Sequence, residues 1–431
     1  MTENTLCPIS TSLKKALAKE FDARYRLGSR ISWEPFVGQW ARYLDSEIPT
    51  APSVRSILFN EKKTSCELRI IDGLCQLLLG CSYEAWKAPH IHKLTNVVRR
   101  YKLEKETENI IIEPGSLLRI KSPASMGKNL FINNVLNELN KKRYTVVKYN
   151  CLEVDQECLK DYNVFLKNFC CCLIEKLNLS EELLSLSKWR STIVPNRNLT
   201  RYFEKVFFSE KKNDLILVIS NFDLLLENEN INTNICRLFR SWYEKARQGD
   251  TNSEMWQRFH IIILHSTEFY AELNIHTSPL ANVGKTVELA EFNLQEIKDL
   301  SQQYNLALKT EDIQKLMNFV GGHPLLINLA FQYLNNHRDN NLQTDLDFIF
   351  NTAMEETGIY ANHLRKLLAI LKNNSSLKEI FQLMLLTTES LEINAPIISW
   401  QLYSLGLIKR LDNHQLTVSC LLYRQYFKQN L

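Results

Sequence analysis

The residues with the clearest chemistry lie in one short loop, Ser122-Pro-Ala-Ser-Met-Gly-Lys-Asn129. The loop follows the apolar run Leu117–Ile120 and precedes the amphipathic segment Asn129–Leu139, so it is predicted to join a strand to a helix. The free backbone N–H groups at a helix N-terminus favour anions, and a Gly-Lys pair gives phosphates close backbone approach and a cation. The pattern predicts a phosphate-binding loop for ATP or ADP. Its candidate contacts are Ser125, Met126, Gly127, Lys128 and Asn129.

The same loop departs from what nucleotide hydrolysis requires. Ser122 stands where a first glycine is expected, and Asn129 stands where a Ser or Thr hydroxyl would bind Mg²⁺. A later apolar run, Leu215–Ile219, predicts a buried strand, and its tip reads Ser220-Asn221-Phe222-Asp223 without an acidic pair. Neutral side chains bind a hard cation poorly, so neither a metal site nor a catalytic residue is predicted here. The sequence leaves open whether Asp223 could turn back toward Mg²⁺.

These side chains need a sheet to position them. Four short apolar runs alternate with helical segments through the middle of the chain: Leu117–Ile120, Thr145–Tyr149, Leu215–Ile219 and His260–Leu264. Runs that are apolar on both faces are typical of parallel strands covered by helices. We therefore predict an α/β fold with an open parallel sheet.

Helical periodicity dominates both flanks of this region and gives four predicted domains. They are an all-α module over 1–100, the α/β domain over 101–290, a helical lid over 291–350, and a winged-helix-like domain over 351–431. In the last domain, a helix over Ile397–Leu405 is followed by two short strands, Leu407–Leu411 and Gln415–Val418. A helix followed by a small hairpin is the order of elements in a winged helix.

The composition is that of a globular protein, but the positive charge is unevenly distributed. The chain has 431 residues, 45% of them hydrophobic and 23% charged, which excludes a disordered, collagen-like or disulfide-scaffold protein. The net charge is +4, and residues 1–108 hold 17 Lys and Arg against 13 Asp and Glu, so the excess lies there. Four basic residues near a joint between two short helices are candidates to contact DNA or an acidic partner: Arg55, Lys62, Lys63 and Arg69. A solvated face of a small helical bundle is the alternative.

Cysteine usage and hydropathy indicate the cellular compartment of the protein. The 11 cysteines include no CxxC pair, and no apolar run approaches the roughly 18 residues of a membrane span. We therefore expect a cytoplasmic protein with reduced thiols and no membrane contact. Only His90 and His92 form a close histidine pair, and no metal site is expected.

Several segments in a fixed order resemble one family. They include Asn109–Gly115, Leu118–Pro123, Met126–Lys128, Leu238–Trp242, His265–Glu268, Phe319–Pro324, Thr357–Tyr360, Ser404–Ile408 and Leu422–Phe427. Over about 95–431 the chain resembles the bacterial AAA-like P-loop ATPases, related to the STAND and ORC/Cdc6 types. The resemblance implies that Gly127 and Lys128 bind phosphate. It also implies that Ser266 or Thr267 is a polar sensor, and that His323 and Pro324 contact the base and ribose from the lid.

The all-α module over 1–100 separately resembles helix-turn-helix-like modules of bacterial signalling proteins. The resemblance lies in Pro52–Ile57 and Leu74–Trp86. The leading hypothesis is a pseudo-ATPase with weak or absent activity. It would act as a nucleotide-responsive or structural scaffold in signalling, defence or DNA transactions, with a protein partner and self-association. The alternative is an active ATP-binding switch of the STAND type, and a third hypothesis is a DNA-binding regulator.

Overall fold

The computed structural model divides the chain into two compact units, residues 1–95 and 96–431. The structure describes these residues: 6–8, 11–27, 30–43, 49–60, 63, 65–79, 98–139, 143–187, 189–211, 213–250, 252–266, 280, 282–337, 341–387, 390, 395–411 and 415–431. No helix among them is long and apolar enough to cross a membrane.

In the described residues of the first unit, four helices pack around an aromatic core of their own. They are α1 (Thr11–Tyr25), α2 (Trp33–Tyr43), α3 (Ala51–Phe59) and α4 (Leu68–Leu79). Phe21, Phe36 and Trp40 are fully buried in this core. The module was predicted to be all-α, and the structure adds two short antiparallel pairs: β1 (Leu6–Pro8) with β4 (Ser65–Glu67), and β2 (Arg26–Leu27) with β3 (Arg30–Ile31). Strands of two or three residues are too short to give an alternating pattern.

The second unit contains the predicted parallel sheet, with the four predicted strands and a fifth that was not predicted. The predicted strands are β5 (Leu117–Lys121), β6 (Tyr144–Asn150), β7 (Asp214–Ser220) and β8 (Phe259–His265), and the fifth is β9 (Lys285–Glu288). Their order across the sheet is β6-β7-β8-β5-β9, and every pair is parallel. The predicted α/β class is confirmed. Because β5 lies between β8 and β9, the loop after it lies next to the tip of β8, and the tip of β7 follows along the same carboxyl edge of the sheet.

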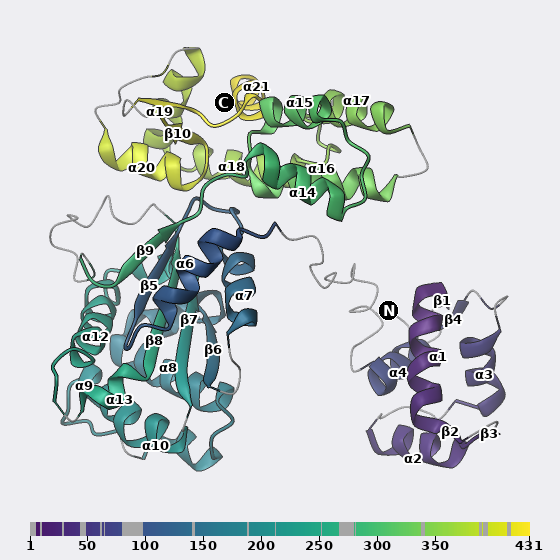
Figure 1. Cartoon of the computed structure of the whole chain (residues 1–431), viewed down its shortest axis with the longest axis horizontal. Helices are drawn as coiled ribbons and strands as arrows, with labels where there is room; N and C mark the ends of the chain where they lie inside the picture. The colour runs from purple at the N-terminus through teal and green to yellow at the C-terminus, as the bar shows by residue number, and fades with distance from the viewer. Residues whose placement is uncertain are drawn as a thin grey trace. The chain divides into compact units, whose positions relative to one another are not determined.

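Helices cover both faces of this sheet, and alternate residues of each strand belong to two separate cores. One core joins the strands to α6 (Tyr101–Ile111) and α7 (Lys128–Glu138). The other joins them to α8 (Tyr162–Lys176), α9 (Pro195–Tyr202) and α12 (Asn232–Lys245). Figure 1 shows the strands side by side between these helices. Shorter elements complete the domain: η1 (Cys151–Glu153), η2 (Gln156–Lys160), η3 (Glu181–Ser185), the π-helical η4 (Phe203–Phe207), α10 (Phe208–Glu210), α11 (Asp223–Leu226) and α13 (Ser253–Gln257).

The C-terminal part of the second unit is helical and shares one hydrophobic core. Its helices are α14 (Leu294–Gln303), α15 (Thr310–Val320), α16 (Pro324–Asn336), α17 (Leu342–Thr352), α18 (Ala361–Lys372) and α19 (Ser375–Leu386). It ends with α20 (Pro396–Ser404), the antiparallel pair β10 (Ile408–Arg410) and β11 (Leu416–Val418), and α21 (Leu421–Asn430). The helix and hairpin predicted near the end are present. Two of the helices in this part, α17 and α19, were not predicted individually, although α17 lies mostly in the predicted helical lid.

Candidate phosphate-binding loop

The predicted loop lies between β5 and α7, as the sequence indicates. Gly127 is the N-cap of α7 with φ +84°, a left-handed conformation that favours glycine, and Ser125 is also left-handed, with φ +62°. Met126 and Ser122 are buried, whereas Ser125 and Asn129 are exposed. The loop therefore places Lys128 at the first position of α7, at the positive end of that helix.

The ammonium group of Lys128 hydrogen bonds to its own loop. Its Nζ donates to the carbonyl oxygens of Ser122 at 2.7 Å and Pro123 at 3.0 Å, and it is 3.4 Å from the Ser122 hydroxyl. Carbonyl oxygens of the loop itself are thus the partners of this ammonium group. This lysine holds the loop closed on itself.

The loop is also joined to the C-terminal part of the unit. The backbone N–H of Ala124 donates to the carbonyl of Ser404 at 2.8 Å, where α20 ends. Gly406 follows with φ +78°, and a Cβ there would lie 3.7 Å from the Cβ of Pro123. The Lys121 ammonium lies 5.2 Å from the ring centre of Trp400 in α20, a cation–π contact. We call this contact of the loop and the end of β5 with residues 400–406 the loop joint.

The tips of β7 and β8 are hydrogen bonded to their neighbours. Both oxygens of Asp223 accept from the backbone N–H of Ser266, at 2.9 and 3.0 Å, and Oδ1 also accepts from the Ser266 hydroxyl at 2.8 Å. Asn221, left-handed at φ +55°, donates its amide to Oδ1 of Asn150 at the end of β6, at 2.8 Å. The predicted acid and the predicted sensor residue are therefore bound to each other.

Burial controls the ionisation of this site. Desolvation lowers the pKa of Lys128 to about 8, and the nearby negative charge of Asp223 acts in the opposite direction. Desolvation also lowers the pKa of His265, at the end of β8, to about 4. At neutral pH Lys128 remains mostly charged while His265 is neutral.

His323 and Pro324, the predicted lid contacts, are both buried at the start of α16. A Cβ at Gly406 would lie 3.8 Å from Nε2 of His323, so the imidazole lies beside the loop joint. Neither ring nitrogen has a hydrogen-bond partner among the described residues, and the ring centre lies 5.6 Å from that of His363. Burial and the neighbouring His363 lower the pKa of His323 to about 3.

The residues present fit a phosphate only in part and do not fit Mg²⁺-dependent hydrolysis. Gly127 and Lys128 have the right types and lie at a helix N-terminus. A hard cation needs several oxygen ligands, but Asn129 and Asn221 are neutral, and the carboxylate of Asp223 is satisfied by Ser266. Among the described residues, no group of three or more His, Cys, Asp or Glu could hold a metal ion.

The other predicted contacts belong to the first unit. Arg55 of α3 and Lys63 are exposed, and Arg69 of α4 is partly buried. Lys62 lies outside the described residues, as does Thr267, the second sensor candidate. The structure brings Lys128, Asp223, Ser266 and His323 together within the second unit.

Sequence reasoning missed the residues that close the site. Ser404, Gly406 and Asn150 contact the loop or the strand tips. Ser404 and Gly406 belong to one of the segments that carry the family resemblance, but the resemblance did not assign them to the loop. No local signal shows that a turn about 280 residues along the chain packs on the loop.

Comparison with known proteins identifies a family and several solved structures that are similar to this chain. The AAA-like domain family matches residues 92–429. The "Walker-type ATPase" PABY2304 of Pyrococcus abyssi is similar in structure, with a TM-score of 0.53 and 14% identity over 77% of this chain and 96% of that one. The Aeropyrum pernix ORC2 protein, solved in ADPNP–ADP complexes, has a TM-score of 0.47 and 11% identity over 77% and 93% of the two chains.

A STAND protein with a tetratricopeptide repeat sensor, from Pyrococcus horikoshii, has a TM-score of 0.32 and 14% identity over 77% of this chain and 42% of that one. No curated protein gave a significant match. Since the family match covers most of the sequence, the resemblance seen in the motifs is confirmed. The chain belongs to the AAA-like domain family of P-loop ATPases.

Proposed function

We propose that this chain is a pseudo-ATPase: an AAA-like scaffold that does not turn over ATP and whose phosphate loop serves as a structural joint. The observation that carries the proposal is the set of hydrogen bonds made by the loop itself. Lys128 Nζ donates to the carbonyls of Ser122 and Pro123, and the Ala124 N–H donates to Ser404. The cation and one amide that could bind phosphate instead hold the loop and its neighbour together.

The missing chemistry supports the same proposal. Hydrolysis by this class of protein needs a bound Mg²⁺ and a residue that orients the attacking water. Asn129, Ser220 and Asn221 stand where the hydroxyl and the two acids are expected. Loss of a metal and of water activation each removes orders of magnitude in rate.

Steady-state ATP hydrolysis by the full chain tests this proposal. We expect a rate with Mg²⁺ that equals the buffer background and equals the rate of Lys128→Ala. A wild-type rate clearly above background that is lost in Lys128→Ala would refute the proposal, because it would show turnover that depends on the phosphate lysine.

A second candidate is an ATP-binding switch that responds to nucleotide without efficient turnover. It is favoured by one observation: the charge of Asp223 opposes the desolvation that lowers the pKa of Lys128, so an acid and the phosphate lysine share one site. This candidate predicts Mg²⁺-dependent binding of a fluorescent ATP analogue that is lost in Asp223→Asn. Glu229→Gln, which removes an exposed carboxylate outside the site, is the matched control.

A further inference from the structure

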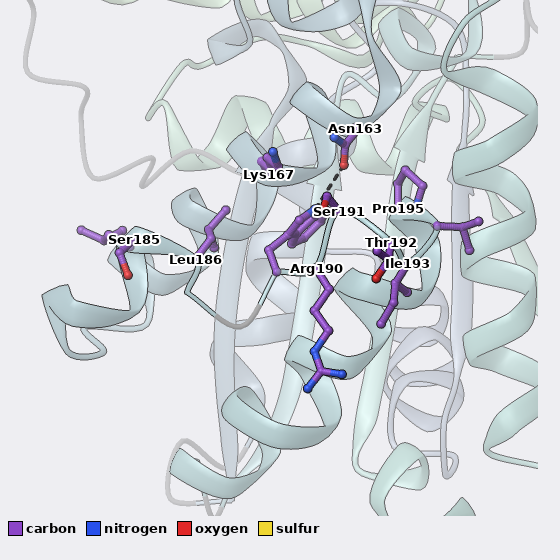
Figure 2. Close-up of a pocket in the computed structure, with 12 residues that line it drawn as sticks. Asn163, Lys167, Ser185, Leu186, Arg190, Ser191, Thr192, Ile193 and Pro195 are labelled. Carbon is purple, nitrogen blue, oxygen red and sulfur yellow. Dashed lines mark hydrogen bonds between the residues drawn. The ribbon is translucent and has the colours of Figure 1, made fainter.

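The second unit contains a cavity that takes no part in the phosphate loop. It has a volume of about 680 Å³ and lies between the N-terminal half of α8 and the segment over 184–195. This volume is within the range of small-molecule sites, about 300–1,000 Å³. Figure 2 shows Asn163 and Lys167 on the α8 side and Ser191 and Thr192 on the loop side.

The helix side of the cavity offers hydrogen-bond donors. Trp189 Nε1 donates to Oδ1 of Asn163 at 3.2 Å, and since an indole can only donate, the amide oxygen faces the tryptophan and leaves the Asn163 NH₂ group as a donor. Lys167 lies four residues further along α8 on the same side of the helix. An amide NH₂ and an ammonium group are therefore neighbours at this wall.

The loop side is fixed by a buried asparagine. Asn198 accepts from the backbone N–H of Arg190 at 3.0 Å, and it donates to the carbonyls of Arg190 at 2.8 Å and Ile193 at 2.9 Å. The side chain is 1% exposed, so these three bonds are shielded from water. The wall is thus formed by the protein alone, which lowers the ordering cost when a ligand binds.

The charged residues that line the cavity are all positive. Lys167 and Arg190 are cations, Ser185, Ser191 and Thr192 carry hydroxyls, and none of the twelve lining residues is Asp or Glu. Within the part of the chain that the structure describes, neither cation takes part in an ion pair. The remaining lining is apolar, with Leu184, Leu186 and the half-buried Trp189. Unpaired donors beside an apolar surface suit an anion that has an apolar body.

We propose that this cavity binds a small organic anion, with its charged group at Lys167 and Asn163 and a planar apolar body against Trp189 and Leu186. The site is separate from the proposed pseudo-ATPase function and does not depend on it. A carboxylate or a phosphate could supply the charge, because both accept hydrogen bonds from an ammonium and an amide.

Titration calorimetry on the full chain, with three matched probes, tests the proposal. 1-Naphthyl phosphate has both the anion and the planar body, 1-naphthol has the body alone, and inorganic phosphate has the anion alone. We expect 1-naphthyl phosphate to bind at least tenfold more tightly than either partial probe, and 1-naphthoate to bind as a carboxylate equivalent. No heat from 1-naphthyl phosphate at 1 mM, or equal affinity for 1-naphthol, would overturn the proposal.

Two variants of residues that line the cavity test whether the probe binds there. Lys167→Gln should weaken 1-naphthyl phosphate at least tenfold, and Thr192→Glu, which places a carboxylate on the rim, should do the same. Arg197→Gln removes an exposed cation two residues beyond the lining and should leave the affinity unchanged. Lys128→Ala should also leave it unchanged, which separates this site from the phosphate loop.

Circular dichroism melting of each variant shows whether it is folded, and only folded variants are compared. Both exchanged side chains reach the surface, so neither change removes core packing. Wild-type affinity in both Lys167→Gln and Thr192→Glu would show that the probe binds elsewhere and would refute the assignment.

Discussion

Lys128 is the residue whose role differs most between the two candidate functions. In the structure its ammonium group satisfies two carbonyls, those of Ser122 and Pro123. Ser122 is fully buried, so loss of the lysine would leave its carbonyl without this donor. A lysine that served only to hold phosphate would contribute little to the folding of the free protein.

We therefore expect Lys128→Met to lower the free energy of unfolding by about 1–3 kcal/mol, the usual cost of unpaired buried polar groups. Urea denaturation without nucleotide measures this change. Lys315→Met, at an exposed position of α15, is the control and should stay within about 0.5 kcal/mol of wild type. Equal stability of both variants would contradict a structural role for Lys128.

Asp223 and Ser266 form the second residue-scale test. The carboxylate accepts three hydrogen bonds from one residue, and bonds to a charged acceptor contribute about 1.5–3 kcal/mol. Asp223→Asn should destabilise the chain by an amount in this range in chemical denaturation. Because the two side chains share one bond, Ser266→Ala combined with Asp223→Asn should cost less than the sum of the single changes. Additive effects would mean that the pair is not coupled.

The sequence predicted which residues would gather here but not what they would bond to. Gly127, Lys128 and Asp223 follow from local patterns, since a strand, a loop and a helix N-terminus are adjacent in the chain. Ser404 and Asn150 do not, because their contacts with the site depend on how distant elements pack. Contacts between residues far apart in the chain leave no periodic signal in a single sequence.

At the scale of elements, the loop joint links the sheet to the C-terminal helices. Besides the Ala124–Ser404 bond, the Tyr403 hydroxyl donates to Glu288 of β9 at 3.2 Å. The guanidinium group of Arg410 in β10 lies 3.7 Å from the ring centre of Trp400. The same ring also contacts the ammonium group of Lys121 at the end of β5. Residues from β5, β9, α20 and β10 therefore converge on one small region.

Gly406 is a position in this joint where a side chain is disfavoured on conformational grounds. Its φ of +78° is left-handed, although an added Cβ would meet Pro123 and His323 only at ordinary contact distances of 3.7 and 3.8 Å. Gly406→Ala should therefore lower the free energy of unfolding by about 1–2 kcal/mol, from backbone strain alone. Thermal unfolding measures this. A loss of 4 kcal/mol or more would show that the joint is packed more tightly than these distances indicate.

Two helices near the C-terminus, α17 and α19, were not predicted individually. The segments of α17 and α19 carry apolar residues at helical spacing, Leu342, Leu346 and Ile349 in the first and Leu377, Phe381 and Met384 in the second. The sequence therefore held the signal for both helices, and it was not used. Four strands of the sheet were predicted correctly because helical segments separate them and their runs are apolar. The fifth, β9, was missed because only Val287 of its four residues is buried, which leaves no apolar run.

At the scale of the whole molecule, buried histidines make stability depend on pH. Burial lowers the pKa of His260, His265 and His363 to about 4 and that of His323 to about 3. The ordinary value is 6.5, so between pH 6.5 and 4 the unfolded chain binds more protons than the folded chain. Stability is therefore full above pH 6.5 and falls as the pH drops, by up to about 1.4 kcal/mol per pH unit for each histidine.

His323→Leu isolates one part of this pH dependence. Neither imidazole nitrogen has a partner among the described residues, so an apolar side chain of similar size should be tolerated at pH 7. We expect its unfolding free energy, followed by urea denaturation from pH 7 to 4.5, to fall less steeply than that of wild type. Parallel profiles for the two proteins would contradict the burial of a neutral His323.

The basic excess of the first 108 residues remains the basis of the DNA hypothesis. Arg55 and Lys63 are exposed in the first unit and could contact phosphates. If they do, a labelled duplex should bind with an affinity that falls steeply with salt, and Arg55→Gln with Lys63→Gln should reduce that slope by about 2. Binding that is absent at 50 mM salt would remove this hypothesis, while leaving the proposal for the phosphate loop untouched.

The two units have separate hydrophobic cores, so each unit can be tested for independent folding. The described core residues of the first unit all lie between Leu13 and Leu78, and those of the second begin at Val98. A unit with its own core can fold alone. Residues 96–431 expressed alone should therefore unfold cooperatively, with a midpoint within about 3 °C of the matching transition of the full chain. A loss of cooperativity in calorimetry would show that the first unit is needed to complete the AAA-like domain, and the loop joint would then have to be tested only in the full chain.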